Sequence, residues 1–104
     1  MNEYDPKTEI PLEGLEEFFD GFLLSRQEEL GLMRDALVLL DFNTLSQIAH
    51  QWKGFSAPYG FGKLERLAIE LEVCAHNAQA EHCESILLEA DQYLNLKKSS
   101  SRKS

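Results

Sequence analysis

The sequence is poor in several residue types and patterns that define common classes of protein. Its 104 residues include two cysteines, three prolines and one tryptophan, and no apolar run approaches the roughly eighteen residues that a membrane-spanning helix needs. Residues 1–10 are polar and acidic and lack the basic and apolar regions of a secretory signal, so we expect a cytoplasmic protein. In that compartment Cys74 and Cys83 are expected to be reduced, buried thiols.

Basic residues are also scarce. There are 10 Lys and Arg residues against 18 Asp and Glu residues, which gives a net charge of −8. Such an acidic body is repelled by nucleic acid and by anionic lipid, so neither is an expected partner. The exception is the segment 97–104, which holds four basic residues and no acidic one. We interpret 97–104 as a flexible basic tail, 1–11 as a poorly ordered arm and 12–96 as one folded domain.

What the sequence does contain is helical periodicity, whereas the alternation typical of strands is absent. Apolar residues recur every three or four positions in segments 12–24, 26–40, 64–78 and 83–94, and in a further segment from Asp41–Thr44 to about Ala57. Either Asp41 or Asn43 is expected to cap this last segment. Short connections favour antiparallel neighbours. The predicted fold is therefore all-α: an antiparallel up-down four-helix bundle with an additional N-terminal capping helix.

The segment 26–40 is apolar on two sides. Leu30, Met33, Leu37 and Leu40 form one stripe, and Leu32, Ala36 and Leu39 form another nearly opposite. A helix of this kind is either covered on both sides or presents one side to a partner. We favour the first alternative, in which the helix 12–24 folds back over the second stripe.

The segment that ends near Ala57 carries the chemistry. At 100° per residue His50 lies about 140° from Leu45, so it points away from the core face. That core face consists of Leu45, Ile48, Ala49, Trp52, Phe55, Ser56 and Tyr59. Lys53 and Gly54 lie one turn after His50 on its flanks. The histidine is therefore predicted to face solvent beside a cation and a position without a side chain.

These neighbours suit phosphoryl transfer. A neutral imidazole is a good nucleophile near pH 7 and can attack the phosphorus of an aspartyl phosphate. Lys53 can neutralise a phosphate oxygen. Gly54 costs a helix about 1 kcal/mol relative to Ala, and no packing requirement explains it. A bare site would leave room for the phosphoryl group and for an approaching protein.

The spacing His50-x-x-Lys53-Gly54-x-Ser56, followed by Gly60 and Leu64, resembles the signature of the histidine-containing phosphotransfer (HPt) domain family. The run from Leu64 through Leu71 and Glu72 resembles the next helix of that family, and the likeness covers about residues 12–96. Trp52 and Phe61 depart from the family pattern. We expect local repacking around Trp52 and partial exposure of Phe61.

The resemblance implies a phosphocarrier of a two-component phosphorelay, not a kinase, with no ATP site. His50 would be phosphorylated on Nε2 and would exchange phosphate with receiver domains of response regulators or hybrid kinases. Lys53 would neutralise the phosphate, Gly54 would give clearance, Ser56 would fill a small position beside the core and Gly60 would serve the turn. No cofactor is expected in the chain itself, because the receiver supplies the divalent metal ion.

We expect a monomer whose receiver partner docks on the exposed face of the histidine helix and on helix 26–40. The nearest candidates for contact are Ser46, Gln47, Gln51 and Ala57.

Three other functions compete with this interpretation. The first is a non-catalytic adaptor or decoy that binds a receiver domain, and an auxiliary phosphate-draining role would use the same His50. The second is a zinc site formed by Cys74, His76, His82 and Cys83, but their spacing lacks the paired pattern of structural zinc sites, so no metal site is predicted. The third is a hydrolase, for which no convincing Ser/His/Asp or Cys/His arrangement is present.

Overall fold

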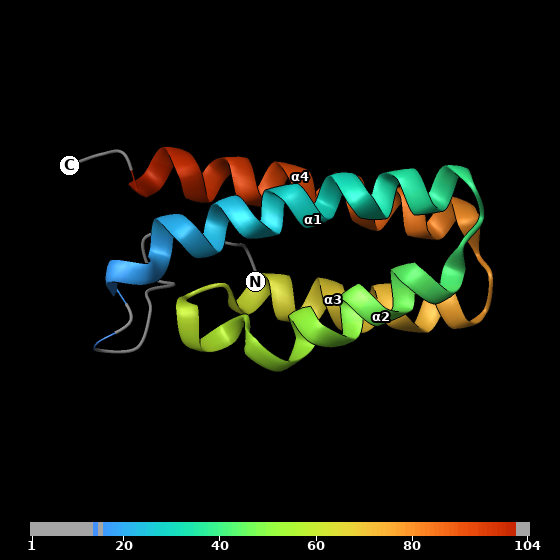
Figure 1. The fold of residues 1–104 in the computed structure, drawn as a ribbon, viewed down its shortest axis with the longest axis horizontal. Coiled ribbons are helices and arrows are strands. Elements are labelled where there is room, and N and C mark those ends of the chain that lie inside the picture. Colours follow the sequence, from blue (N-terminus) through green and yellow to red (C-terminus); the bar gives the residue numbers. More distant parts are fainter. Residues whose placement is uncertain (1–13, 15, 102–104) are drawn as a thin grey trace, which may run out of the picture.

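The computed structural model describes Gly14 and residues 16–101, and these form a bundle of four helices. A short 3-10 turn, η1 (Glu16–Phe18), leads into α1 (Phe19–Val38), which is followed by α2 (Phe42–Phe55). A second 3-10 turn, η2 (Ala57–Tyr59), leads into α3 (Gly62–His76), and α4 (Ala80–Ser101) completes the bundle. Consecutive helices run antiparallel, with α1 and α4 in one layer and α2 and α3 in the other (Figure 1). The all-α fold and the four-helix bundle are thus confirmed.

The predicted capping helix is wrong. Within the described residues the segments expected as two helices, 12–24 and 26–40, are one continuous helix, α1, preceded only by η1. The buried positions of α1 explain the continuity: Phe22, Leu23, Leu30 and Met33 lie on one stripe, and Arg26 fills the position between them. Because Arg26 is charged, the sequence pattern indicates a break in the apolar stripe at this position. Residues 1–11, predicted as an arm, and residues 12, 13 and 15 lie outside the described residues.

Arg26 behaves as a core residue because its charge is matched. Its guanidinium carbon lies 4.4 Å from the ring centroid of Phe22 and 4.7 Å from that of Phe55, and its Nε donates to Glu29 Oε1 at 2.8 Å. Cation–π contacts and an ion pair together offset the cost of removing a guanidinium from water. The same Glu29 oxygen accepts a hydrogen bond from Trp52 Nε1 at 2.7 Å. This connects α1 to α2 on the buried side of the histidine helix.

Two expectations about the end of the bundle near Phe61 are also corrected. Phe61 was expected to be partly exposed, but it is fully buried and its ring stacks on Phe19 at a centroid distance of 5.2 Å. The basic tail was expected to begin at Lys97, but α4 continues to Ser101. Lys97 is 1% exposed, with its Nζ 5.1 Å from the Phe61 ring centroid. Its long apolar stem and its charge over an aromatic ring allow it to be buried.

Both turns at the opposite end of the bundle use the same backbone closure. The amide of Asp41 donates to Ala36 O at 2.8 Å after α1, and the amide of Gln79 donates to Cys74 O at 2.9 Å after α3. The residue before each donor, Leu40 or Ala78, has a positive φ, 57° and 53° respectively. This is the Schellman geometry, in which glycine is usual. Asp41 then caps α2, because its carboxylate accepts from the Thr44 amide at 3.2 Å, so the first residue of the helix that carries His50 is fixed.

The two cysteines lie inside the bundle as predicted. Cys74 and Cys83 are buried, both are free thiols, and their Sγ atoms lie 3.3 Å apart between α3 and α4. Burial raises the pKa of the Cys74 thiol to about 12. This thiol therefore stays protonated at neutral pH, which makes it a packing residue rather than a nucleophile. None of the helices in the described part of the chain has the length and hydropathy of a membrane-spanning segment.

Candidate functional site

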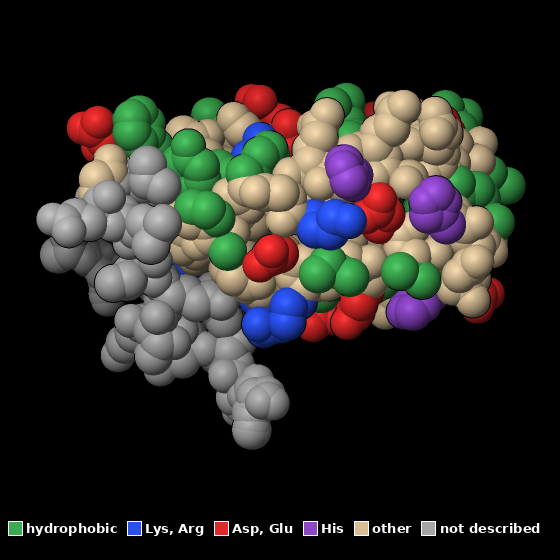
Figure 2. Space-filling view, turned by 90° about the horizontal axis from the view of Figure 1, so that it is seen from below, with side chains coloured by type: hydrophobic (Ala, Val, Ile, Leu, Met, Phe, Trp, Pro, Cys, Tyr) green, Lys and Arg blue, Asp and Glu red, His purple; other side chains and the backbone are tan. Residues whose placement is uncertain are grey.

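His50 lies in the middle of α2 and faces outward. Its side chain is 67% exposed, whereas Leu45, Ala49 and Trp52 on the opposite side of the helix are buried. The outward direction predicted from the helical pattern is confirmed. Figure 2 views the face formed by α2 and α3, and shows histidine, basic and acidic side chains side by side near its middle.

A carboxylate from the neighbouring helix joins His50 to Lys53. Glu72, on α3, places Oε2 3.2 Å from His50 Nδ1 and Oε1 2.8 Å from Lys53 Nζ. Each carboxylate oxygen therefore serves one of the two α2 side chains. The side chain of Glu72 is 19% exposed, so its contacts with His50 and Lys53 are partly shielded from water.

The charge state of Glu72 determines which ring nitrogen of a neutral His50 carries the proton. The hydrogen bond from Lys53 is the largest influence holding the pKa of Glu72 below its ordinary value, against an opposing effect of burial, and the hydrogen bond with His50 acts in the same direction as Lys53. Glu72 is therefore ionised at neutral pH and can only accept hydrogen bonds. Nδ1 of a neutral His50 must then carry the proton, which leaves the lone pair on Nε2, the other ring nitrogen.

Gly54 stands one turn after His50 on the exposed side of α2. A Cβ built at this position would meet nothing within 4 Å, apart from its chain neighbours and the backbone of its own helix. Neither a turn nor a close backbone approach requires glycine here. The residue leaves an uncovered patch of helix backbone next to the histidine.

Ser56 and Gly60 shape the end of the histidine helix. Ser56 is fully buried, and its Oγ has no hydrogen-bond partner among the described residues. Its carbonyl accepts from the amides of Tyr59 at 3.2 Å and Phe61 at 3.0 Å. Gly60 has φ 91°, in the left-handed region that glycine adopts readily. Both residues contribute to the backbone turn into α3, away from the exposed imidazole.

Three of the four predicted docking residues lie on α2, and the fourth, Ala57, is the first residue of η2. Gln47, Gln51 and Ala57 are exposed, and Ser46 is half-buried. The structure adds two apolar residues from α3 that sequence reasoning did not select: Ile69 is 45% exposed and Val73 is 55% exposed. They lie three residues before Glu72 and one after it, so the acidic partner of His50 has apolar neighbours on the same helix.

Glu72 is the site residue that sequence reasoning missed. In the sequence it stands in the run that resembles the next helix of the family, where nothing local indicates a role for it. No local spacing connects it to His50, because the two residues are 22 positions apart on different helices. One signal was available: Glu72 follows the core residue Leu71 on a helix expected to pack antiparallel to the histidine helix.

The four residues considered for zinc do not meet. Cys74 and Cys83 converge in the core, whereas His76 and His82 are exposed. Over the described ranges, no group of three or more His, Cys, Asp or Glu side chains is arranged to hold a metal ion.

Comparison with known proteins identifies the family. The profile of the Hpt domain matches residues 17–98, which is most of the chain. The chain therefore belongs to the Hpt domain family, whose members carry a phosphoryl group on histidine in phosphorelays and interact with receiver domains. Neither a curated protein nor a solved structure gives a significant match.

Proposed function

We propose that this chain is a phosphocarrier in which His50 accepts a phosphoryl group from the aspartate of one receiver domain and passes it to the aspartate of another. The observation that supports this most directly is the exposed ring of His50 with its Nδ1 at 3.2 Å from a carboxylate oxygen. This arrangement leaves Nε2 as the nucleophile and keeps the ring oriented.

The transfer step follows from these contacts. The Nε2 lone pair attacks phosphorus, an N–P bond forms, and the P–O bond to the receiver aspartate breaks, which returns that aspartate as a carboxylate. The ring gains positive charge while Nδ1 keeps its proton. Glu72, already at hydrogen-bond distance, stabilises that charge. The reverse sequence delivers the group to a second receiver.

Lys53 is proposed to neutralise the transferred group. Its Nζ is paired with Glu72 at 2.8 Å, one helical turn from His50. A lysine ammonium is a mobile point charge on a flexible stem, so it can turn from the carboxylate to a phosphoryl oxygen. The chain itself needs no cofactor for this step, because the receiver brings the divalent metal ion.

The receiver is proposed to dock on the face of α2 and α3 around His50. Gln47 and Gln51 supply polar contacts on α2, with Ser46 at the edge, and Ala57 supplies a small contact on η2. Ile69 and Val73 supply apolar contacts on α3. Gly54 keeps the centre of this face uncovered. We further propose that the chain acts as a monomer in the cytoplasm.

The test is phosphoryl transfer from a phosphorylated receiver domain to the full chain. We expect label that is stable to base and labile to acid, as a phosphohistidine is, and no label on His50→Gln. The variants His76→Gln and His82→Gln serve as controls and should be labelled normally. Label that persists in His50→Gln would overturn the assignment, and a chain that binds the receiver without ever being labelled would be an adaptor.

A further inference from the structure

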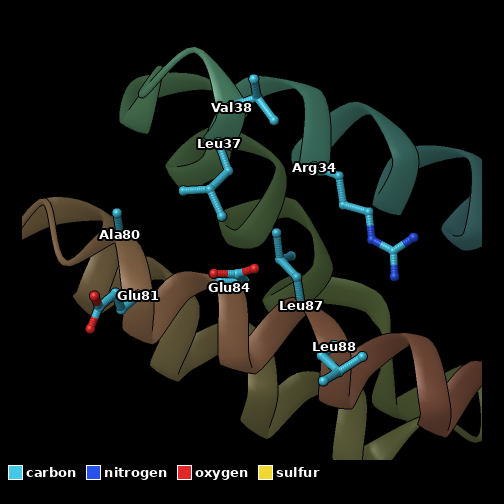
Figure 3. Close-up of a pocket in the computed structure, with 8 residues that line it drawn as sticks. All are labelled: Arg34, Leu37, Val38, Ala80, Glu81, Glu84, Leu87 and Leu88. Atoms are coloured by element: carbon cyan, nitrogen blue, oxygen red, sulfur yellow. The ribbon is translucent and has the colours of Figure 1, made fainter.

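A second surface lies on the opposite side of the bundle from His50. The end of α1 and the start of α4 enclose a groove of about 570 Å³. Leu37 and Val38 reach it from α1, and Leu87 and Leu88 reach it from α4 (Figure 3). Because α1 and α4 form one layer and α2 and α3 the other, the groove and the imidazole lie on different layers of the molecule.

Two of the apolar side chains at this groove are strongly exposed, whereas Leu87 is buried beneath them. Val38 is 81% exposed and Leu88 is 53% exposed. The apolar surface continues into the adjoining turn, where Leu39 is 77% and Leu40 is 61% exposed. Leu40 also has φ 57°, a conformation that costs a leucine more than a glycine. An exposed apolar patch is typical of a binding site.

The charges around the groove are mainly acidic. Arg34 lines one end, but Asp91 pairs with it at 3.3 Å. Glu81 and Glu84 line the other part, are exposed, and form no ion pair with any residue that the structure describes. Glu81, in the first turn of α4, also interacts favourably with the positive end of the helix dipole. Glu84 lies beyond that turn, so its position gains little from the dipole.

These charges argue against a second copy of the chain as the occupant. A symmetric dimer through this groove would bury the same mainly acidic surface of both copies in one interface. Each copy also carries a net charge of −8, so the two bodies repel one another. A cationic partner would instead be attracted by Glu81, Glu84 and the net negative charge of the chain.

We propose that the groove between α1 and α4 binds an amphipathic helix of a partner protein, with an apolar stripe flanked by Lys and Arg. The apolar stripe would lie against Val38 and Leu88, and the basic flank would face Glu81 and Glu84. An amphipathic helix in a groove between two helices is a recurrent mode of recognition. The position of the groove lets this partner stay bound while a receiver occupies the face of α2 and α3. The proposal does not depend on phosphorylation of His50.

The test uses two synthetic 18-residue helical peptides with the same leucine stripe, one flanked by lysines and one by glutamates. Each is titrated into the full chain and followed by amide NMR shifts. We expect the lysine-flanked peptide to shift residues 34–40 and 80–88. The variant Val38→Ser/Leu88→Ser should bind it about tenfold more weakly, which corresponds to about 1.4 kcal/mol. The variant Glu84→Lys should bind it more weakly and should improve binding of the glutamate-flanked peptide.

Matched controls separate this site from general attraction to an acidic protein. Leu96→Ser, at another exposed leucine of α4, and Glu70→Lys, on α3, should leave binding of the lysine-flanked peptide nearly unchanged. Equal losses in these controls, shifts centred on α2 and α3, or equal binding of both peptides would overturn the proposal. Concentration-dependent self-association through Val38 and Leu88 would overturn it in favour of a second copy. Slower receiver-dependent labelling of Val38→Ser/Leu88→Ser would assign the groove to the receiver instead.

Discussion

Nδ1 of His50 lies 3.2 Å from Oε2 of Glu72, on the neighbouring helix α3. The contact fixes which ring nitrogen carries the proton, and it places a negative charge where the ring would become positive in the proposed transfer. The same carboxylate holds Lys53 through its other oxygen. One glutamate therefore orients both the imidazole that is proposed to act as the nucleophile and the cation that is proposed to meet the phosphoryl group.

The first prediction concerns the contribution of Glu72 to transfer. Glu72→Ala should slow single-turnover transfer from a phosphorylated receiver at least about tenfold, because a hydrogen bond to a charged group contributes about 1.5–3 kcal/mol. His50 should still become labelled. Glu70→Ala, an exposed glutamate two positions away on α3, is the control and should transfer at the native rate. A native rate for Glu72→Ala would show that the hydrogen bond is not used.

The second prediction concerns pH. Because Lys53 lowers the pKa of Glu72 in the folded chain, the stability from this contact is fully present above the pKa that this glutamate has in the unfolded chain, about 4.5. It is lost as the pH falls through the lowered folded pKa. Urea unfolding should therefore show native protein more stable than Glu72→Gln at about pH 7 and a smaller difference at about pH 3. The same comparison made in a Lys53→Met background should show little dependence on pH.

The third prediction separates the two consequences of Gly54. Gly54→Ala should raise the free energy of unfolding by about 1 kcal/mol, since the added Cβ meets nothing within 4 Å and alanine favours a helix. Gly54→Leu should fold as well as Gly54→Ala but should slow phosphoryl transfer, because its side chain would cover the approach to His50. Gly31→Leu, at an equally open glycine of α1, should fold and should transfer at the native rate. Equal rates for Gly54→Leu and Gly31→Leu would contradict the role of clearance.

The fourth prediction concerns the support behind the histidine helix. Glu29 accepts hydrogen bonds from Trp52 at 2.7 Å and from Arg26 at 2.8 Å. Glu29→Ala leaves both donors without this acceptor in a mostly buried place, and should lower the free energy of unfolding by about 2 kcal/mol in chemical denaturation. Glu28→Ala, at the adjacent exposed position, should change it by less than about 0.5 kcal/mol. Similar losses for the two variants would remove the argument for this connection.

Much of the fold was predictable because most helices follow simple periodicity. The core residues of α3, among them Leu64, Leu67 and Leu71, are buried as their spacing indicates. The outward direction of His50 follows from the same count along α2. These features depend on residues within one helix, where the geometry is regular, so a single sequence is sufficient to infer them.

The split of α1 and the missed role of Glu72 have a different origin. In both cases a charged side chain is held by a partner on another helix. Arg26 lies in the apolar stripe of α1 because the rings of Phe22 and Phe55 accept its guanidinium, and Phe55 is on another helix. Glu72 pairs with His50 and Lys53 across a helix boundary. The contact with Phe55 and the contacts of Glu72 join different helices, so they leave no local pattern. A sequence argument therefore splits α1 at a polar position and leaves the partner of the histidine without a role.

The burial of Lys97 bears on where this domain can be cut. Its ammonium lies within 6.0 Å of the ring centroids of Phe19, Phe61 and Tyr93, which join the beginning of α1, the start of α3 and the last turns of α4. A shortened version ending at residue 96 would keep the histidine and its neighbours on α2 and α3 but would leave this aromatic cluster open to water. Recombinant versions meant for fusion or crystallisation should therefore extend through the final turn of α4.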